Sequence, residues 1–237
     1  MPVNKESAKV MAFPGLGERA AEAKSRIAAA VARGGHGQRV TIVAVTKTHS
    51  AEAVTGAWSA GVADVGENKV QEALGKMPEV AAPVRWHLIG HLQRNKVKAL
   101  DSFSLFHALD SARLADSVDA FGRTRGRPVE VLLQVNVGRE ESKGGYDMAE
   151  LDAEATRLAS MTGVHVTGVM ILARLGAGER ELREVFGAAR AAREVLLEAG
   201  HPATQLSMGM SSDFEIAVEE GATLVRLGTI LFGVREQ

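Results

Sequence analysis

The segment VTIVAVTKTHSAEAVTGAWSAGVADV (residues 40–65) carries a pattern that indicates the fold class. It begins with VTIVAV (40–45), a short, β-branched, apolar run that is typical of a strand buried on both faces in a parallel sheet. Helix-forming residues follow at 51–60, and a second apolar run follows near 62–65. Because a strand, a helix and a strand in this order pair in parallel through a right-handed crossover, the segment predicts one β/α unit.

The same alternation continues along the rest of the chain. Further strands are expected near 84–89, 103–107, 129–135, 164–170, 204–206 and 223–226. Further helices are expected over 68–77, 111–121, 147–160, 179–199 and 212–220. Eight strand units fit closure into a ring, so the predicted fold class is α/β, a single (β/α)8 TIM-type barrel, with an open doubly wound sheet as the alternative.

One domain accounts for the whole chain. Apolar residues make up 46% of the 237 residues, which is enough for one large core, so 1–237 is predicted to be a single domain. Residues 16–33 are rich in Ala with apolar positions at helical spacing, and they predict a leading helix before the first strand. The segment 1–15 is expected to be flexible.

The charge balance and the residue types exclude several classes of function. Lys and Arg number 28 and Asp and Glu number 29, so the net charge of −1 predicts neither nucleic acid nor a membrane as a partner. The absence of cysteine excludes a disulfide framework, a thiolate nucleophile and Cys-based metal sites. The N-terminus has no apolar signal region, and cytoplasm is therefore the expected location.

Lys47 is a candidate for covalent chemistry. It follows the strand predicted at 40–45, and the C-terminal ends of barrel strands are where reactive groups gather. Partial burial there disfavours the ammonium form, and the free amine attacks aldehydes. A lysine paired with a nearby carboxylate is the alternative interpretation. Lys143, in the loop after the fifth strand, is a rival for the same reaction.

The segment LSMGMSSDFEIAVEEGATLVRLGTILFG (206–233) has the composition of an anion site. Its glycines and hydroxyls fall at the ends of the last two predicted strands, which is where barrel phosphate sites are found. Ser207, Gly228 and Thr229 supply a hydroxyl, close backbone approach and free N–H groups. The alternative is that Gly209 and Gly228 are only turn glycines.

Other polar residues near the predicted strand ends have ordinary structural explanations. Asn68, in GENKVQE (66–72), could cap the following helix or point its amide into the mouth of the barrel, and capping is the expected role. His87 and His91 are four residues apart in WHLIGHLQRNK (86–96), a spacing that suits metal ligands on one helix. Because Gly90 interrupts the run and His87 falls in a strand pattern, we expect structural histidines and no metal.

Five segments together resemble the pyridoxal-phosphate homeostasis protein family, whose barrel is similar to the N-terminal domain of alanine racemase. The likeness spans residues 16–235. The segments, in order, are AVTKTHS, GENKVQE, WHLIGHLQRNK, QVNVGREESKGGY and LSMGMSSDFEIAVEEGATLVRLGTILFG.

This resemblance implies pyridoxal 5′-phosphate (PLP) as the cofactor. It implies that Lys47 forms the imine with PLP and that Arg226 faces the pyridine nitrogen. It also implies that Ser207, Gly228 and Thr229 bind the phosphate, and that Asn68 and Met170 lie close to the ring. An alanine racemase has a second domain and a tyrosine base, whereas this sequence ends at Gln237 and its single tyrosine is Tyr146 in the fifth-strand loop.

The resemblance implies a non-catalytic protein of vitamin B6 homeostasis that carries or buffers PLP. Its expected partners are PLP and PLP-dependent apoenzymes as acceptors, and a monomer is expected. A slow PLP-dependent amino-acid racemase is one alternative. A cofactor-free aldolase-type barrel that uses Lys47 on a sugar phosphate is another.

Overall fold

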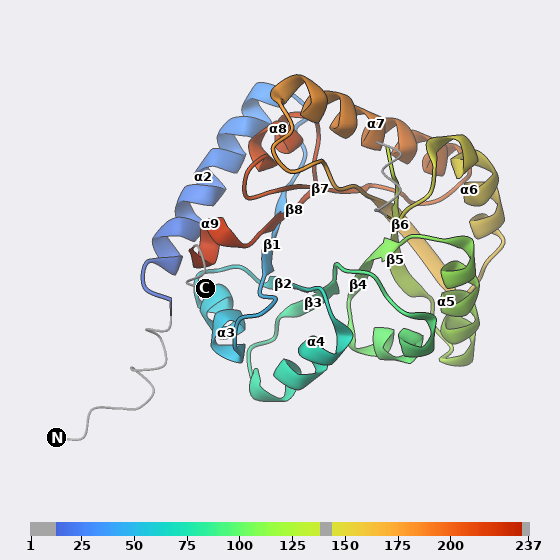
Figure 1. Cartoon of the computed structure of the whole chain (residues 1–237), viewed down its shortest axis with the longest axis horizontal. Helices are drawn as coiled ribbons and strands as arrows, with labels where there is room; N and C mark the ends of the chain where they lie inside the picture. The colour runs from blue at the N-terminus through green and yellow to red at the C-terminus, as the bar shows by residue number, and fades with distance from the viewer. Residues whose placement is uncertain (1–12, 138–143, 234–237) are drawn as a thin grey trace.

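A computed structural model of the protein describes residues 13–137 and 144–233. In this part of the chain eight parallel strands close into a barrel in the order β1 to β8 (Figure 1). The strands are β1 (Thr41–Val45), β2 (Asp64–Glu67), β3 (Arg85–Leu88), β4 (Leu105–Leu109), β5 (Val129–Gln134), β6 (Val164–Met170), β7 (Gln205–Met210) and β8 (Leu224–Leu227). The predicted (β/α)8 barrel is confirmed, and the pairing of β1 with β8 excludes the open sheet.

Helices surround the barrel, as Figure 1 shows. They are α2 (Leu16–Gly34), α3 (Ala51–Ser59), α4 (Val70–Lys76), α5 (Ala112–Thr124), α6 (Leu151–Ala159), α7 (Glu179–Glu198), α8 (Phe214–Glu219) and α9 (Thr229–Phe232). The third unit has a 3-10 helix, Arg94–Ser102, between β3 and β4. None of the described helices has the length and apolar character needed to cross a membrane.

The leading helix α2 packs against α8 and α9, near the other end of the chain. Its C-terminus lies so close to α8 that a Cβ on Gly34 would be 2.4 Å from the carbonyl oxygen of Glu219. Phe13, inside the segment expected to be flexible, makes an edge contact with Phe232, with 5.3 Å between ring centroids. This aromatic pair places Phe13 against α9.

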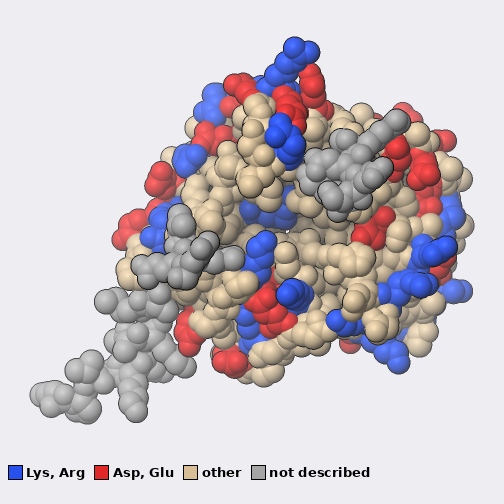
Figure 2. Space-filling model, in the orientation of Figure 1, with Lys and Arg blue, Asp and Glu red and all other residues tan. Residues whose placement is uncertain are grey.

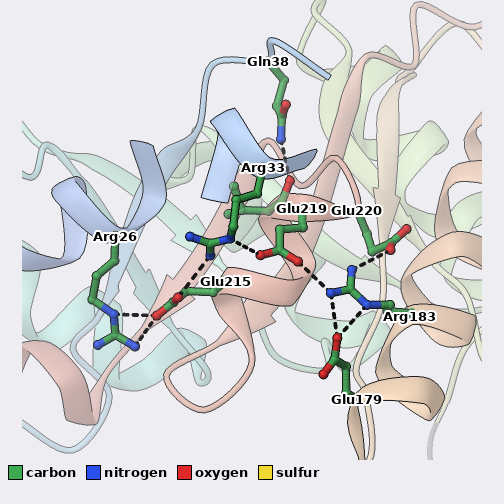
Figure 3. Close-up of polar contacts among 9 residues, drawn as sticks. Arg26, Arg33, Gln38, Glu179, Arg183, Glu215, Glu219 and Glu220 are labelled. Carbon is green, nitrogen blue, oxygen red and sulfur yellow. Dashed lines mark hydrogen bonds and ion pairs between the residues drawn. The ribbon is translucent and has the colours of Figure 1, made fainter. Parts of the chain in front are cut away.

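Ion pairs join α2, α7 and α8 on the outside of the barrel (Figure 3). Arg33 on α2 donates to Glu219 on α8 at 2.6 Å, and Glu219 also accepts from Arg183 on α7 at 2.7 Å. Arg26 donates to Glu215 at 2.5 Å. These hydrogen bonds connect three helices that are far apart in sequence, through side chains that are partly exposed.

Candidate functional site

Several of the residues that the sequence singles out lie at one end of the barrel. This is the end at which the strands terminate, where barrel enzymes and binding proteins place reactive groups. Lys47 follows β1, Asn68 follows β2, Met170 ends β6, and Gly228 follows β8. In the view along the barrel in Figure 2, Lys and Arg atoms gather around the central hollow. A positive opening of this kind attracts a small anion.

Lys47 lies on a turn with unusual backbone geometry. It is half-buried and sits between Thr46, which is fully buried, and Thr48, which is exposed. Thr48 has a φ of 64°, the only positive φ of a non-glycine residue in the described ranges. A β-branched residue adopts this conformation only where surrounding contacts hold it. The turn that carries Lys47 is therefore fixed by its neighbours.

A buried ionic cluster behind the turn supplies these contacts. The ammonium group of Lys76 donates to the carbonyl oxygen of Thr46 at 2.9 Å and to Glu67 and Glu72, each at 2.7 Å. Glu72 in turn accepts the backbone N–H of Thr48, and Glu67 accepts the hydroxyl of Thr46 at 2.7 Å. Residues on both sides of Lys47 are thus bonded to one cluster.

Glu67 is the strained member of this cluster. Its side chain is fully buried, and among the described residues its Oε2 atom has no hydrogen-bond partner. Burial raises its pKa, although the hydrogen bonds from Lys76 and Thr46 act in the opposite direction. The desolvation of the Glu67 carboxylate is therefore offset by the Lys76 ammonium group and by the Thr46 hydroxyl.

A cup of backbone N–H groups lies at the start of α9, beside the turn of Lys47. The hydroxyl oxygen of Ser211 accepts from the N–H of Gly228 at 3.2 Å and of Ile230 at 3.4 Å. Thr229 lies between them and is exposed. Ala44 on β1 is paired with Leu227 on β8, so the cup is next to the strand that leads to Lys47. Converging N–H groups and hydroxyls are what a phosphate requires.

Ser207 does not lie at this cup. It is fully buried inside the barrel, where its hydroxyl oxygen accepts from Arg226 at 2.6 Å and lies 2.9 Å from Nδ1 of His107. The structure therefore places Ser211, and not Ser207, beside the N–H groups of Gly228 and Ile230. A register shift between Ser207 and Met210 separates the two serines.

Gly209 accounts for this shift. Its φ is +90°, and a Cβ would lie 2.6 Å from the Cβ of Ala217 on α8. Only glycine allows this combination of backbone conformation and close approach. Gly209 is thus more than a turn glycine, because it directs the chain from the barrel interior at Ser207 to the cup at Ser211.

Arg226 is buried at the centre of the barrel. Its Nη1 donates to the carbonyl oxygen of Ser207 at 2.8 Å as well as to the hydroxyl, and its Nη2 donates to the carbonyl oxygen of Ile171 at 2.9 Å. No described residue accepts from its Nε. Burial lowers the pKa of Arg226 to about 10, so the guanidinium remains charged at neutral pH. The Arg226 guanidinium only donates hydrogen bonds, and it has N–H groups left for a further acceptor.

The other predicted residues have varied outcomes. Met170 is 1% exposed and lies beside Ser207 in the register of β6 and β7, on the barrel wall. Asn68 is half-buried at the end of β2 and does not cap α4, whose N-cap residue is Lys69. The expected capping role is therefore wrong. Lys143 lies outside the described residues.

The two histidines of WHLIGHLQRNK have separate surroundings. His91 is exposed and contacts Asp110 at 2.7 Å. His87 is inside the barrel, with Nε2 at 3.0 Å from Asp64 and Nδ1 at 2.8 Å from Nε2 of His107. The sequence pattern does not indicate that His107 and Asp64 belong to one group. Each is a polar residue within a short apolar run, Asp64 near 62–65 and His107 in 103–107.

Comparison with known proteins identifies the family of this chain. Residues 21–236 match the family model of the alanine racemase N-terminal domain. The pyridoxal phosphate homeostasis protein of Pseudomonas aeruginosa is 38% identical over 224 residues, covering 93% of this chain and 96% of that protein. The Escherichia coli K12 protein of the same name is 35% identical over 225 residues, covering 91% and 95% of the two chains.

Solved structures of related proteins have the same fold. PipY of Synechococcus elongatus, with PLP bound, is 38% identical and has a TM-score of 0.82, with 92% of this chain and 100% of that chain covered. Alanine racemase of Corynebacterium glutamicum shares the fold at 16% identity and a TM-score of 0.73, with 95% and 62% covered. The chain belongs to the pyridoxal phosphate homeostasis protein family, with the barrel of the alanine racemase N-terminal domain.

Proposed function

We propose that this protein binds PLP through an imine on Lys47 and serves as a carrier or buffer of the cofactor. The observation that carries the proposal is the placement of the lysine turn beside the cup of Ser211, Gly228 and Ile230. An amine and a phosphate site on adjoining strands match the aldehyde and the phosphate arm of one molecule. The PLP-bound structure of the relative PipY supports the assignment.

The residues present fit each part of PLP. The cup offers N–H groups and the hydroxyl of Ser211 to the phosphate, and Thr229 adds a second, exposed hydroxyl. Arg226 has N–H groups left over for an acceptor such as a pyridine nitrogen. Met170 presents an apolar wall to a flat ring. When bound, PLP supplies an aldehyde for amines and an electron-withdrawing ring.

Two features disfavour turnover of amino acids. Arg226 can only donate to a ring nitrogen, so it favours the unprotonated pyridine and weakens electron withdrawal by the ring. Tyr146 donates to Glu154 at 2.7 Å and is 6% exposed. Burial, followed by its bond to Glu154, raises the pKa of Tyr146, so the single tyrosine does not act as a base at neutral pH. A carrier that releases PLP to apoenzymes is the function we infer.

A mixing experiment tests this function. The protein is loaded with PLP, and L-alanine is added while the visible spectrum and the chirality of alanine are followed. We expect slow release of cofactor and no racemisation above background, because the site holds PLP without assisting proton transfer at Cα. Sustained racemisation that disappears in Lys47→Ala would replace the carrier with an enzyme. A protein that takes up no PLP would contradict the assignment altogether.

A further inference from the structure

We propose that His107 is a positioning residue for PLP, acting on Arg226 through the hydroxyl of Ser207. The inference rests on the proposed function, because it concerns how the barrel interior prepares Arg226 for the cofactor. It assigns a role to residues from the middle of the barrel that do not line the cup or the lysine turn.

One chain of hydrogen bonds crosses the barrel interior. It begins at Asp64 on β2 and continues through His87 on β3, His107 on β4 and Ser207 on β7 to Arg226 on β8. The successive distances are 3.0 Å from Asp64 to His87, 2.8 Å to His107, 2.9 Å to Ser207 and 2.6 Å to Arg226. The five side chains belong to residues that are at most 4% exposed. His107 and Ser207 are 0% exposed, so bulk water is not a ready substitute for either of them.

We assign the donor and the acceptor of each hydrogen bond in this chain, starting from Asp64. Burial opposes ionisation of Asp64, but hydrogen bonds from His87 and Arg85 outweigh it and leave the pKa of Asp64 below its usual range. An ionised carboxylate only accepts, so His87 donates from Nε2. In the proposed arrangement His87 carries one proton, on Nε2, so it accepts at Nδ1 and His107 donates from Nε2. His107 in turn accepts at Nδ1, which makes Ser207 the donor of that bond.

His107 is held neutral by its surroundings. Burial, with additional repulsion from the Arg226 guanidinium, lowers the pKa of His107 well below its usual range. The groups that face it are His87 from β3, Ser207 from β7 and Arg226 from β8. A neutral His107 that donates at Nε2 has a lone pair at Nδ1 for Ser207. It therefore holds the Ser207 proton away from Arg226.

This arrangement fixes the orientation of the Arg226 guanidinium. A serine hydroxyl rotates freely unless a partner accepts a hydrogen bond from it. Because the Ser207 hydroxyl donates to Nδ1 of His107, its oxygen directs a lone pair at Nη1 of Arg226. The carbonyl oxygen of Ser207 also accepts from Nη1, and the carbonyl oxygen of Ile171 accepts from Nη2. Nε and the unused N–H of Nη2 are then left for the ring of the cofactor.

Three variants separate positioning from simple packing. His107→Asn keeps an acceptor near the place of Nδ1, whereas His107→Leu removes both hydrogen bonds. His201→Asn is the matched control, because His201 is also buried but its ring, among the described residues, bonds to the carbonyl oxygen of Ala155 outside this chain of hydrogen bonds. We expect His107→Leu to raise the dissociation constant for PLP by about tenfold or more, as for one lost hydrogen bond to a charged group. His107→Asn and His201→Asn should stay within about threefold of the unmutated protein.

Nitrogen NMR of the histidine side chains tests the chain itself without cofactor. We expect His87 and His107 to be protonated at Nε2 and unprotonated at Nδ1 in the apoprotein. A proton on Nδ1 of His107 would overturn the proposal, since Ser207 would then lose its acceptor. The NMR measurement needs no PLP and is therefore independent of the proposed function.

The binding data discriminate in the same way. If His107→Leu lowers the melting temperature but binds PLP as the unmutated protein does, His107 has only a packing role and the inference fails while the proposed function stands. If His107→Leu does not fold, Ser207→Ala provides the same comparison, because it removes the hydroxyl that His107 orients. If the unmutated protein binds no PLP, the proposed function fails, and the positioning role fails with it.

Discussion

The ammonium group of Lys76 lies 2.7 Å from Oε1 of Glu67, and it also bonds to the carbonyl oxygen of Thr46, the residue before Lys47. The side chain of Lys76 is 10% exposed and that of Glu67 is fully buried. A buried pair of this kind holds a loop firmly but costs desolvation of both charges. The cluster therefore connects the stability of the barrel with the geometry of its reactive lysine.

Removing one partner of this pair is expected to destabilise the protein strongly. Lys76→Met leaves Glu67 as an uncompensated buried charge, and we expect the free energy of unfolding to fall by about 3–5 kcal/mol at neutral pH. The double variant Lys76→Met with Glu67→Met should recover most of this loss. Denaturant unfolding measures both. A single variant as stable as the unmutated protein would show that the pair does not support the turn.

Lys47→Ala is expected to abolish the borohydride-reducible attachment of PLP while the fold remains intact. The side chain is half-buried on a turn and contributes little to the core, so circular dichroism should not change. Peptide mapping after reduction identifies the labelled lysine, and Lys69→Ala at an exposed position is the control. Labelling at Lys143 with unchanged yield would transfer the role to that residue.

Ser211 and Ser207 are expected to affect different parts of the ligand. Ser211→Ala and Thr229→Val should each weaken PLP binding by about 1–3 kcal/mol, the range for a hydrogen bond to a charged group. The same substitutions should leave the weak binding of pyridoxal, which lacks the phosphate, almost unchanged. Ser207→Ala should weaken both vitamers alike. Titration with PLP and with pyridoxal measures these effects. If Ser207→Ala weakens PLP binding alone and Ser211→Ala weakens the binding of both vitamers, Ser207 is the residue that binds the phosphate.

Acidification is expected to remove a stabilising contribution of Asp64. Its pKa is lowered in the folded state, so the contribution is fully present above the unfolded value near 4 and is lost as pH falls through the folded value. The difference in unfolding free energy between the unmutated protein and Asp64→Asn should shrink from about pH 6 to about pH 3. A constant difference would mean that ionised Asp64 does not stabilise the fold.

The ion pairs among α2, α7 and α8 are expected to contribute little at high salt. Arg183 contacts Glu179, Glu219 and Glu220, but its side chain is 39% exposed (Figure 3). We expect Arg183→Ala to cost about 1 kcal/mol or less, and less again in 1 M salt, where screening is stronger. Thermal unfolding at two salt concentrations measures this. A loss that does not depend on salt would indicate packing by the arginine stem.

The barrel could be predicted because its signals are local. Each strand is a short apolar run and each helix has its own periodicity, so VTIVAV (40–45) predicts β1 without reference to the rest of the chain. The position of Lys47 just beyond that strand follows equally directly. Parallel pairing then places all strand ends at one mouth. Fold class and the reactive end of the barrel were therefore determined by sequence.

The choice between Ser207 and Ser211 was not local. The two hydroxyls are four residues apart in one glycine-rich segment, and the register shift at Gly209 decides which of them reaches the N–H groups of α9. That shift depends on the approach of α8 to Gly209, which is a tertiary contact. A one-residue change of register moves a side chain from one face to the other, so sequence pattern alone cannot assign it.

The interior chain depended on closure of the whole barrel. His107 and Ser207 are 100 positions apart, and each looks locally like an isolated polar residue in an apolar strand. They meet because the small lumen of an eight-stranded barrel forces inward-facing side chains from different strands into contact. The sequence predicts a strand that includes His107 (103–107) and one that ends just before Ser207 (204–206), whereas β7 extends from Gln205 to Met210. Only the closed tertiary structure decided their partners, because hydrogen bonds across a barrel form between groups that share no sequence neighbourhood.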